Sequence, residues 1–592
     1  MTAIVADLDT WLAPLEGLVS GAVVDGVPVL LASRPGPVTG GIYFRVGYAD
    51  ETLPVGGITH LVEHLALHHH DLADRHTNGH TTEQWTGFHT TGTAGEVVAF
   101  LNEVCASMRD LPLGRIDTEK EILRAEAARN GRGGIGAAMR VWRYGARGPG
   151  LSGQDEEGLF RLGTDEVTGW VNTWFTSGNA VAFLTVDEVP AELSLGLPPG
   201  ERRPVRLPPE TLPSKPAWFR SGFDGIVLDA MVPRTPAANV FSAVVTRVLM
   251  RELRRDQGLS YDAGCGYDRI EADTARLTIH ADALEAKAGV VTSVVAEILA
   301  GMRAGRVDRA DIDAIREQAA RELDLPDLGA AILPGTCIDL LLGADVMDPR
   351  DRAAMDAVTV EDVAEVARAV WADALVAISS GHGFGGATRA PHQSNSAVEG
   401  TTYTSLVKEG NELVIGPDGV TRRTPDSLVT VRFDDLAAIG AVADGARQLT
   451  GNDALSIAVE PTLWKGLDAE IVARDIDSRV PSEMVVPYPP REVDRIPEPP
   501  KNPAPLEPAD SSPPAWDGFG PWAVWTAFAL YVLAALASLP ALIGLWSLMH
   551  DDLPREDQTI QIVWIGATAL LWLFAGGLTF GVRRRIRLNE QG

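Results

Sequence analysis

Apolar residues in the first 385 positions follow two alternating spacings, one typical of strands and one typical of helices. Strand-like runs lie at 26–33, 40–49 and 87–93, and a helix-like run at 94–111 follows them. The same order returns later, with strand-like runs at 224–233, 258–267 and 275–282 and a helix-like run at 238–257. These patterns predict two related α/β halves, at residues 1–200 and 215–385.

Residues 400–490 show short apolar runs separated by turn residues. Strands are expected on both sides of the turn Pro417-Asp418-Gly419, and again at 456–461 and 470–476. The pattern predicts a small β-rich domain, which loosely resembles bacterial pleckstrin-homology-like domains. The Pro-rich residues 496–518 that follow favour a semi-extended linker.

The C-terminal end of the chain is apolar enough to enter a membrane. Neither 519–549 nor 558–582 contains Asp, Glu, Lys or Arg, and each run is long enough to cross a bilayer as a helix. The tail at 583–592 is basic, so the positive-inside tendency places it in the cytoplasm. We therefore expect a two-helix transmembrane hairpin in the cell membrane, with all preceding domains on the cytoplasmic side.

Charge and cysteine content narrow the class of protein. The chain has 51 Lys and Arg against 80 Asp and Glu, a formal net charge of −29. This argues against a nucleic-acid partner, because phosphate binding draws on clustered basic residues. Cys105, Cys265 and Cys337 are widely spaced and odd in number, so no disulfide framework is expected and a reducing compartment fits.

The stretch His60-Leu61-Val62-Glu63-His64 carries the strongest chemical signal. On a helix, positions four apart share a face, so both imidazoles can bind one metal ion while Glu63 projects toward a water beside it. This is the layout of a zinc site with its own general base. A helix is expected to begin near Gly57, with Thr59 as its cap.

A catalytic zinc needs a third protein ligand, and the helix expected at 117–126 offers two candidates. Glu119 and Glu126 lie seven residues apart and therefore on the same helix face. Either carboxylate could reach the metal while the other supports it. The apolar neighbours Ile122 and Leu123 indicate that the part of the helix near Glu126 is buried.

A run of further histidines allows a different ligand set. His68, His69 and His70 follow the motif, and His64 and His68 are again four apart. His76, His80 and His89 lie further along the chain. We favour the interpretation that these histidines line a cleft or are exposed, where they would respond to pH.

The first 385 residues resemble the pitrilysin/insulysin family of inverted-motif zinc peptidases, which includes the mitochondrial processing peptidases. The stretches that carry the resemblance are GGIYFRVGYADE, GGITHLVEHLAL, EKEILRAE, residues 150–187 at the end of the first half, and LRRDQGLSY. The resemblance implies an α+β fold of two related metallopeptidase-like domains, only the first with a zinc motif. It also implies a homodimer, or a heterodimer with a related subunit, because such a two-domain unit is half of a closed chamber.

The same resemblance assigns roles to individual residues. It implies that His60, His64 and Glu126 bind Zn²⁺, that Glu63 is the base, and that Glu119 is a supporting carboxylate. It implies that Arg254 and Tyr261 grip the substrate. The spacing from His64 to Glu126 is shorter here than is usual in the family.

The function that follows is metal-assisted hydrolysis of peptides or unfolded protein segments. The substrate is expected to add as a strand to the sheet edge near residues 78–93, where Asn78 is a candidate contact. The chain is therefore predicted to be a membrane-anchored zinc endopeptidase. The alternative is a catalytically inactive binding or assembly protein on the same fold.

Overall fold

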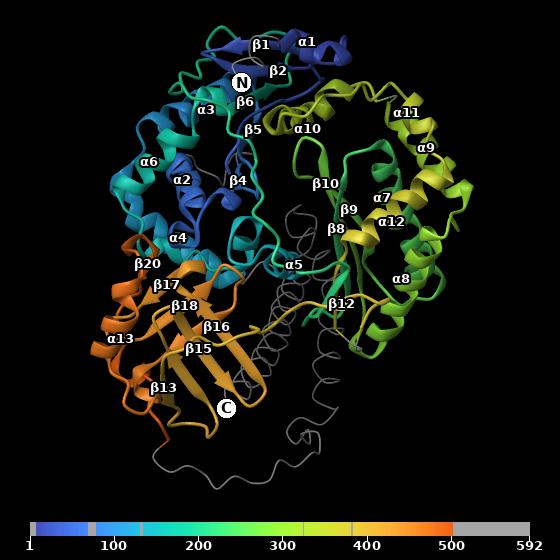
Figure 1. Cartoon of the computed structure of the whole chain (residues 1–592). Coiled ribbons are helices and arrows are strands. Elements are labelled where there is room, and N and C mark those ends of the chain that lie inside the picture. Colours follow the sequence, from blue (N-terminus) through green and yellow to red (C-terminus); the bar gives the residue numbers. More distant parts are fainter. Residues whose placement is uncertain (1–7, 69–77, 131–133, 324, 380–382, 501–592) are drawn as a thin grey trace, which may run out of the picture. The chain divides into compact units, whose positions relative to one another are not determined.

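The computed structural model describes residues 8–68, 78–130, 134–323, 325–379 and 383–500 (Figure 1). The predicted membrane helices at 519–549 and 558–582, the basic tail, and most of the linker at 496–518 lie outside this part. Among the described residues, no single helix is both long and apolar enough to cross a membrane. One bent pair, Arg309–Leu323 with Leu328–Leu342, meets that measure only when its two helices are taken together.

The N-terminal half is built on a six-stranded sheet of order β1-β2-β6-β3-β5-β4. Its strands are β1 (Ser20–Val24), β2 (Val27–Leu31), β3 (Val38–Phe44), β4 (Asn78–Thr81), β5 (Thr86–Gly92) and β6 (Ala180–Leu184). β2 pairs with β6 in parallel, and the other neighbours are antiparallel. The strand-like runs predicted at 26–33, 40–49 and 87–93 are thereby confirmed.

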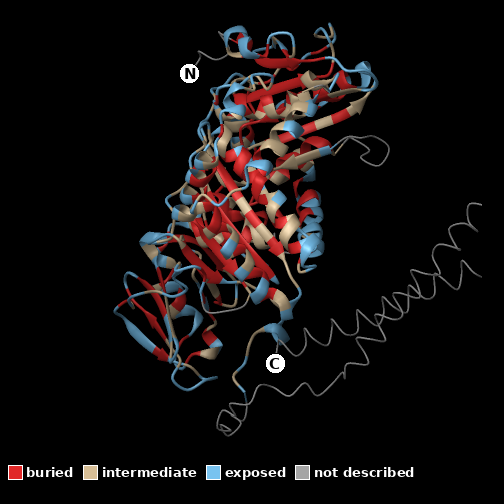
Figure 2. Ribbon diagram, turned by 90° about the vertical axis from the view of Figure 1, so that its right-hand side faces the viewer, coloured by how far each residue is buried: buried red, intermediate tan, exposed pale blue. Residues whose placement is uncertain are grey.

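Helices cover one face of this sheet and form its core with it. They are α2 (Ile58–Leu67), α3 (Ala94–Arg109), α4 (Ile116–Asn130) and α6 (Thr164–Trp174), and a short α1 (Leu8–Leu12) lies at the start of the chain. In α3 the side chains of Val97, Leu101 and Val104 recur at helical spacing and are fully buried. Figure 2 shows that buried residues concentrate on the strands and on the inner helix faces.

The C-terminal half has a second six-stranded sheet of order β12-β7-β11-β8-β10-β9, in which all strands except the outer β12 repeat this topology. Its strands are β7 (Ala217–Arg220), β8 (Gly225–Pro233), β9 (Ala263–Arg269), β10 (Thr274–Asp282), β11 (Leu375–Ile378) and β12 (Thr388–Arg389). β7 and β11 pair in parallel, as β2 and β6 do. The predicted internal repeat is therefore visible in the strand order.

The helices of the second half are α7 (Pro236–Leu249), α8 (Ala288–Arg303), α9 (Arg309–Leu323), α10 (Leu328–Leu342), α11 (Ala353–Asp356) and α12 (Val360–Asp373). α7 connects β8 to β9 as α2 connects β3 to β4. It therefore stands at the place of the motif helix, as the sequence predicts.

The two halves exchange one helix each. α5 (Gly134–Tyr144) belongs to the first half in sequence, yet Met139 packs with Phe219 and Leu375 of the second sheet. In return, Leu333 of α10 packs against the first sheet, in one core with Phe183. Each sheet therefore buries its second face under a helix from the other half (Figure 1).

Buried ion pairs reinforce this exchange. Glu83, in the turn between β4 and β5, accepts hydrogen bonds from Arg140 of α5 at 2.8 Å and from Arg276 of β10 at 2.9 Å. Arg143 of α5 donates to Asp229 of β8 at 2.7 Å. Because a buried charge is stable only when paired, these contacts fix the two halves in one register.

Residues 401–487 form the predicted β-rich domain as two four-stranded sheets, β13-β14-β15-β16 and β19-β18-β17-β20. The strands are β13 (Thr401–Thr404), β14 (Glu412–Ile415), β15 (Gly419–Thr424), β16 (Ser427–Arg432), β17 (Leu436–Ala441), β18 (Arg447–Gly451), β19 (Ser456–Val459) and β20 (Val485–Pro487). The turn at Pro417-Asp418-Gly419 joins β14 to β15 as predicted.

The strand predicted at 470–476 is wrong, because this segment is the helix α13 (Ala469–Asp475). Asp468 caps it by accepting a hydrogen bond from the amide of Ile471 at 2.8 Å. Val472 and Ile476, four residues apart, both enter the core of the domain. The apolar positions in EIVARDI therefore follow the helical period and not the strand period.

Replacing Glu83 with Gln is expected to lower the free energy of unfolding at pH 7 by on the order of 3 kcal/mol, because buried Arg276 loses its carboxylate. Burial raises the pKa of Glu83, but the charges of Arg276 and Arg140 outweigh it and hold the pKa below its ordinary value of 4.5. The stabilisation is therefore present above pH 4.5 and is lost as the pH falls through the lowered value.

Thermal unfolding of the full chain at pH 7 and below pH 4 tests this expectation. The variant should melt earlier than the wild type at pH 7, and the gap should narrow in acid. Glu317→Gln, at an exposed position of α9, is the matched control and should follow the wild type at both pH values. Equal melting of Glu83→Gln and the wild type at pH 7 would contradict the structural role of the pair.

Candidate metal centre

The motif helix α2 begins at a backbone position that requires glycine. Gly57 has φ of +93°, and a Cβ atom built on it would come within 2.8 Å of Cβ of Glu156. The Glu51 carboxylate then accepts hydrogen bonds from the amides of Gly57 at 2.8 Å and Thr59 at 2.9 Å. The prediction that Thr59 caps the helix is wrong, because Thr59 is already inside the first turn and Glu51 supplies the acceptor.

Glu51 is a residue that the sequence interpretation missed. It lies in the stretch GGIYFRVGYADE, seven residues before the helix, where nothing in the spacing marks it as a cap. Burial raises its pKa to about 7, against the opposing effect of its hydrogen bonds to Thr59 and Gly57. The orientation of α2 therefore depends on a fully enclosed carboxyl group.

His60 and His64 lie side by side on α2, as the spacing of four predicts. Their ring centroids are 5.0 Å apart and the ring planes are nearly perpendicular, at 88°. Both side chains are partly exposed, 27% for His60 and 21% for His64. The two imidazoles can therefore be reached from solvent by an ion and by a substrate.

α4 brings both candidate carboxylates to His64. Oε2 of Glu126 lies 3.7 Å from Nε2 of His64, and Oε2 of Glu119 lies 3.5 Å from Nδ1 of the same ring. Donor atoms of His60, His64 and Glu126 all lie within 4.8 Å of one another. Glu126 therefore joins the two imidazoles, while Glu119 supports His64 from the other side of its ring.

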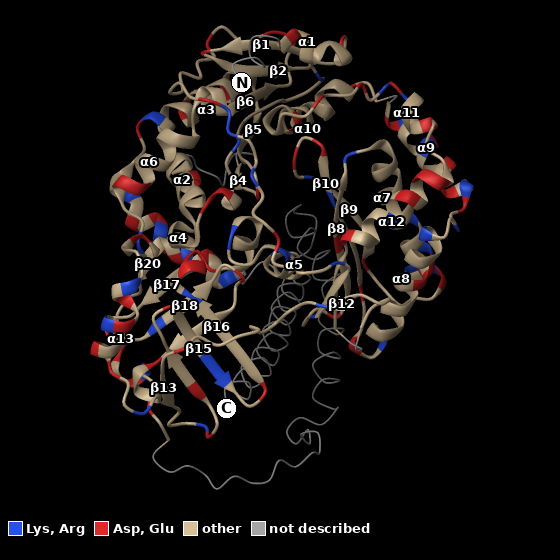
Figure 3. Ribbon diagram, in the orientation of Figure 1, with Lys and Arg blue, Asp and Glu red and all other residues tan. Residues whose placement is uncertain are grey.

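Glu119 is buried and held in place, whereas Glu126 is not buried. Arg115 donates two hydrogen bonds to Oε1 of Glu119, at 3.0 and 2.7 Å. The side chain of Glu126 is 44% exposed, and Ile122 is 44% exposed as well. Leu123 is buried as expected, but the expectation that the helix is buried near Glu126 is wrong for Ile122 and for Glu126 itself. Acidic and basic residues are interspersed along α4 (Figure 3).

The sequence also did not predict a second supporting carboxylate, that of Glu156, which contacts His60. Oε1 of Glu156 lies 3.0 Å from Nδ1 of His60, at hydrogen-bonding distance. Burial lowers the pKa of His60, but the hydrogen bond and charge of Glu156, with the charges of Glu63 and Glu126, outweigh it and raise the pKa to about 9. Each motif histidine thus has a carboxylate at Nδ1, which leaves Nε2 to face a metal ion.

Glu63 points away from solvent toward the edge of the sheet. It is only 6% exposed, and its Oε2 accepts a hydrogen bond of 2.8 Å from the hydroxyl of Thr81 in β4. Burial raises its pKa, against the opposing charge of His60 and the hydrogen bond from Thr81. A carboxylate in such surroundings is a good proton acceptor near neutral pH.

This donor set fits a zinc ion. Two imidazole nitrogens and one carboxylate oxygen are the ligands of a three-residue catalytic zinc site with an open fourth position. The carboxylates of Glu156 and Glu119 orient the rings, as expected around a metal-bound histidine. The group does not include His68, whose Nδ1 lies 3.0 Å from the carbonyl oxygen of Leu65.

The remaining predicted histidines lie apart from this group or outside the described residues. His69, His70 and His76 fall outside them. The rings of His80 in β4 and His89 in β5 are 5.6 Å apart, and His80 also contacts Trp85 at 4.7 Å. Both are half-buried on the sheet.

The predicted substrate residues lie on both halves. Asn78 is exposed at the start of β4, the edge strand of the first sheet. Arg254 lies in η9 (Met250–Asp256), a π-helical turn that ends α7, and its guanidinium lies 5.0 Å from the ring centre of Tyr261. Tyr261 is 77% exposed in a loop before β9. Arg254 and Tyr261 thus meet each other on the second half, whereas the metal donors lie on the first.

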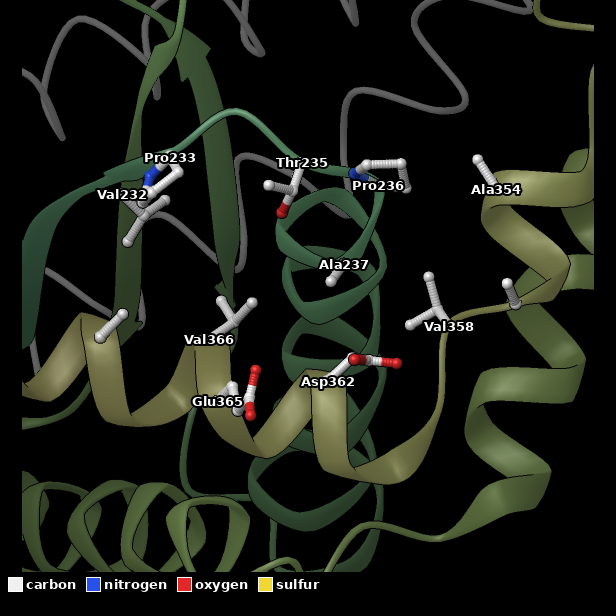
Figure 4. Close-up of a pocket in the computed structure, with 12 residues that line it drawn as sticks. Val232, Pro233, Thr235, Pro236, Ala237, Ala354, Val358, Asp362, Glu365 and Val366 are labelled. Carbon is white, nitrogen blue, oxygen red and sulfur yellow. The ribbon is translucent and has the colours of Figure 1, made fainter.

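A separate cavity of about 450 Å³ lies on the second half, between α7, α11 and α12. Its walls are mainly apolar, with Asp362 and Glu365 of α12 as the acidic groups and Thr235 at the start of α7 (Figure 4). Thr359 donates its amide and hydroxyl to Asp362 in a helix cap. The cavity contains none of the metal donors.

The repeated α+β unit resembles the fold of pitrilysin-type peptidases. Similar solved structures include a protease from Helicobacter pylori, at 15% identity and a TM-score of 0.51, over 61% of this chain and 99% of that chain. The first half of the periplasmic protease PqqL from Escherichia coli matches at 13% identity and a TM-score of 0.50, over 62% of this chain and 92% of that chain. The resemblance predicted from the sequence is thereby confirmed as one of fold.

The complete PqqL protease also matches, at 12% identity and a TM-score of 0.50. The match covers 74% of this chain and 56% of PqqL, so the chain spans little more than half of that protein. Comparisons with protein-family profiles and with curated protein sequences give no match.

Replacing Glu156 with Gln is expected to weaken zinc binding about 10- to 100-fold, because His60 loses the carboxylate at its Nδ1. The dissociation constant is measured by competition with a chromogenic chelator at pH 7.5. Glu188→Gln, the same change at an exposed position, is the control and should bind zinc as the wild type does. Wild-type affinity in Glu156→Gln would mean that this contact does not support the metal site.

Proposed function

We propose that the chain is a membrane-anchored, zinc-dependent endopeptidase that cleaves peptides or extended segments of unfolded proteins. The observation that supports this most is that donor atoms of His60, His64 and Glu126 lie within 4.8 Å of one another. The buried carboxylate of Glu63 directly precedes His64 on the same helix. When bound, a zinc ion supplies Lewis-acid chemistry, because it polarises a carbonyl group and lowers the pKa of water.

Glu63 performs the proton transfers in this proposal. Its carboxylate accepts a proton from the attacking water and then gives it to the amine that leaves. The hydrogen bond from the Thr81 hydroxyl holds one of its carboxylate oxygens in place. Burial around Glu63 keeps bulk water from competing for the proton.

The substrate is proposed to bind as an extra strand along β4. β4 is the edge strand of the first sheet, and Thr81 at its end contacts Glu63 directly. A peptide paired with this edge would therefore carry its backbone past the base, and Asn78 would meet it at the start of the strand. Backbone pairing makes little demand on side chains, which favours a broad range of extended substrates.

Arg254 and Tyr261 are proposed to contact the substrate from a second-half domain. Their exposed cation–π pair offers a charged group and a hydroxyl that could bind a peptide carbonyl. Because the chain spans 56% of PqqL, we propose that two chains assemble, as a homodimer or as a heterodimer with a related subunit. The groups that complete one site could then come from the partner.

The proposed location is the cell membrane, with the catalytic domains on the cytoplasmic side. This rests on the two uncharged runs at 519–549 and 558–582 and on the arginines that follow the second run. Substrates would then be peptides or protein segments in the cytoplasm close to the membrane.

Glu63→Gln is expected to abolish most cleavage of a mixed peptide digest, by about 10²- to 10⁴-fold, because the general base is lost. Zinc content should remain near one per chain, since Gln leaves the metal donors unchanged. Glu188→Gln again serves as the control and should cleave at the wild-type rate. Purified wild type that carries no stoichiometric zinc and cleaves no peptide would instead favour an inactive binding or assembly protein.

The orientation of the hairpin is tested by cysteine labelling in intact cells. In a Cys265→Ser background, Asp551→Cys should react with a membrane-impermeant maleimide, because it lies between the two apolar runs. Asn589→Cys in the basic tail should react only after the cells are opened. The opposite pattern would place the catalytic domains outside.

A further inference from the structure

The β-rich domain packs against loops of the first half, including the segment that leads into the motif helix. Leu53 of η4 (Leu53–Val55), Ala146 and Leu151 form one buried cluster with Ala437 and Ala438 of β17. All five are less than 8% exposed. Leu53 lies two residues after Glu51 and four before Gly57, so β17 packs directly on the segment that leads into the motif helix.

A second contact reaches the loop that carries Glu156. The ring of Tyr488, just after β20, lies 5.5 Å from the ring of Phe160, and Arg161 donates to the carbonyl oxygen of Glu483 at 3.2 Å. Tyr488 is itself fixed on its own domain, because its ring fills the space above Gly440 of β17. Its hydroxyl oxygen is buried next to the Glu157 carboxylate.

The other side of the same loop, residues 155–162, contacts both metal-site helices. Glu156 bonds His60 of α2, and Gly158 packs against the backbone at Gly56, with no room for a side chain. On α4, Lys120 donates to the carbonyl oxygen of Leu162, and Arg124 donates to that of Leu159. Arg124 also lies 4.7 Å above the ring of Phe160. We call residues 155–162 the bridging loop.

The bridging loop therefore lies between the metal centre and the β-rich domain. Its contacts with Tyr488 and with Glu483 are made by Phe160 and Arg161, within five residues of Glu156. The loop has no regular structure beyond the short η7 (Glu157–Phe160), so its position depends on what packs on each side. On one side these are α2 and α4, and on the other they are Tyr488 and β20.

We propose that the β-rich domain is a positioning element of the metal centre, in which Tyr488 holds the bridging loop so that Glu156 stays on His60 and α4 stays beside His64. This inference rests on the zinc site proposed above. The proposal gives the β-rich domain a role in metal binding. Its position in the sequence, between the two halves and the C-terminal segment, does not suggest such a role. A partner that opened this contact would weaken zinc binding without touching a ligand.

Zinc affinity and amide hydrogen exchange of the full chain test the proposal. Tyr488→Ala should raise the zinc dissociation constant about tenfold or more, in line with the loss of a group that orients a ligand. In the zinc-free protein, amides of residues 155–162 should exchange faster than in the wild type. Tyr488→Phe keeps the ring contact with Phe160. Its zinc dissociation constant and its exchange rates at residues 155–162 should stay within about twofold of the wild type.

Tyr403→Ala is the matched control. Tyr403 of β13 is buried in the core of the same domain but lies in the other sheet. It should leave zinc affinity and bridging-loop exchange unchanged. Wild-type affinity and exchange in Tyr488→Ala, or equal losses in Tyr403→Ala, would overturn the proposal. A wild-type chain that binds no zinc would refute the proposed function itself. Equal zinc affinity in the wild type and all variants would refute only the role of the β-rich domain.

Discussion

The contact between imidazole and carboxylate is the interaction on which the rest of the site depends. His60 and His64 each present Nδ1 to a glutamate, Glu156 at 3.0 Å and Glu119 at 3.5 Å. These contacts fix which ring nitrogen remains for a metal ion and how each ring is turned. Because the two glutamates come from different elements, the geometry at the metal donors depends on how α2, α4 and the bridging loop pack together.

The packing of these three elements is tight enough to leave little freedom. Gly57 starts α2 at a positive φ, a side chain there would also meet Glu156, and Gly158 meets the backbone at Gly56. The buried carboxylate of Glu51 accepts hydrogen bonds from two amides at the start of α2. A shift of the bridging loop therefore moves the start of α2 with it, and the ligands on α2 cannot keep their positions independently.

Local periodicity predicts the parts of the site that lie on one helix. The spacing of four in His60 and His64 and the spacing of seven in Glu119 and Glu126 each place two side chains on one face. It does not predict Glu156, which is 96 residues from His60 and belongs to no periodic run. It also does not show which sheet an apolar helix covers, so the exchange of α5 and α10 between the halves could not be foreseen.

That exchange restricts where the proposed substrate residues, Arg254 and Tyr261, can act. α5 and α10 bury apolar side chains in the opposite half, and Glu83 pairs with Arg276 across the two sheets. A movement of one half against the other would break buried apolar contacts and leave charges unpaired, so it is costly. Arg254 and Tyr261 are therefore held at a set position relative to α2 within one chain. If this pair binds peptide as proposed above, the constraint favours a second chain, and not a closing motion of the first, as the source of the Arg–Tyr pair.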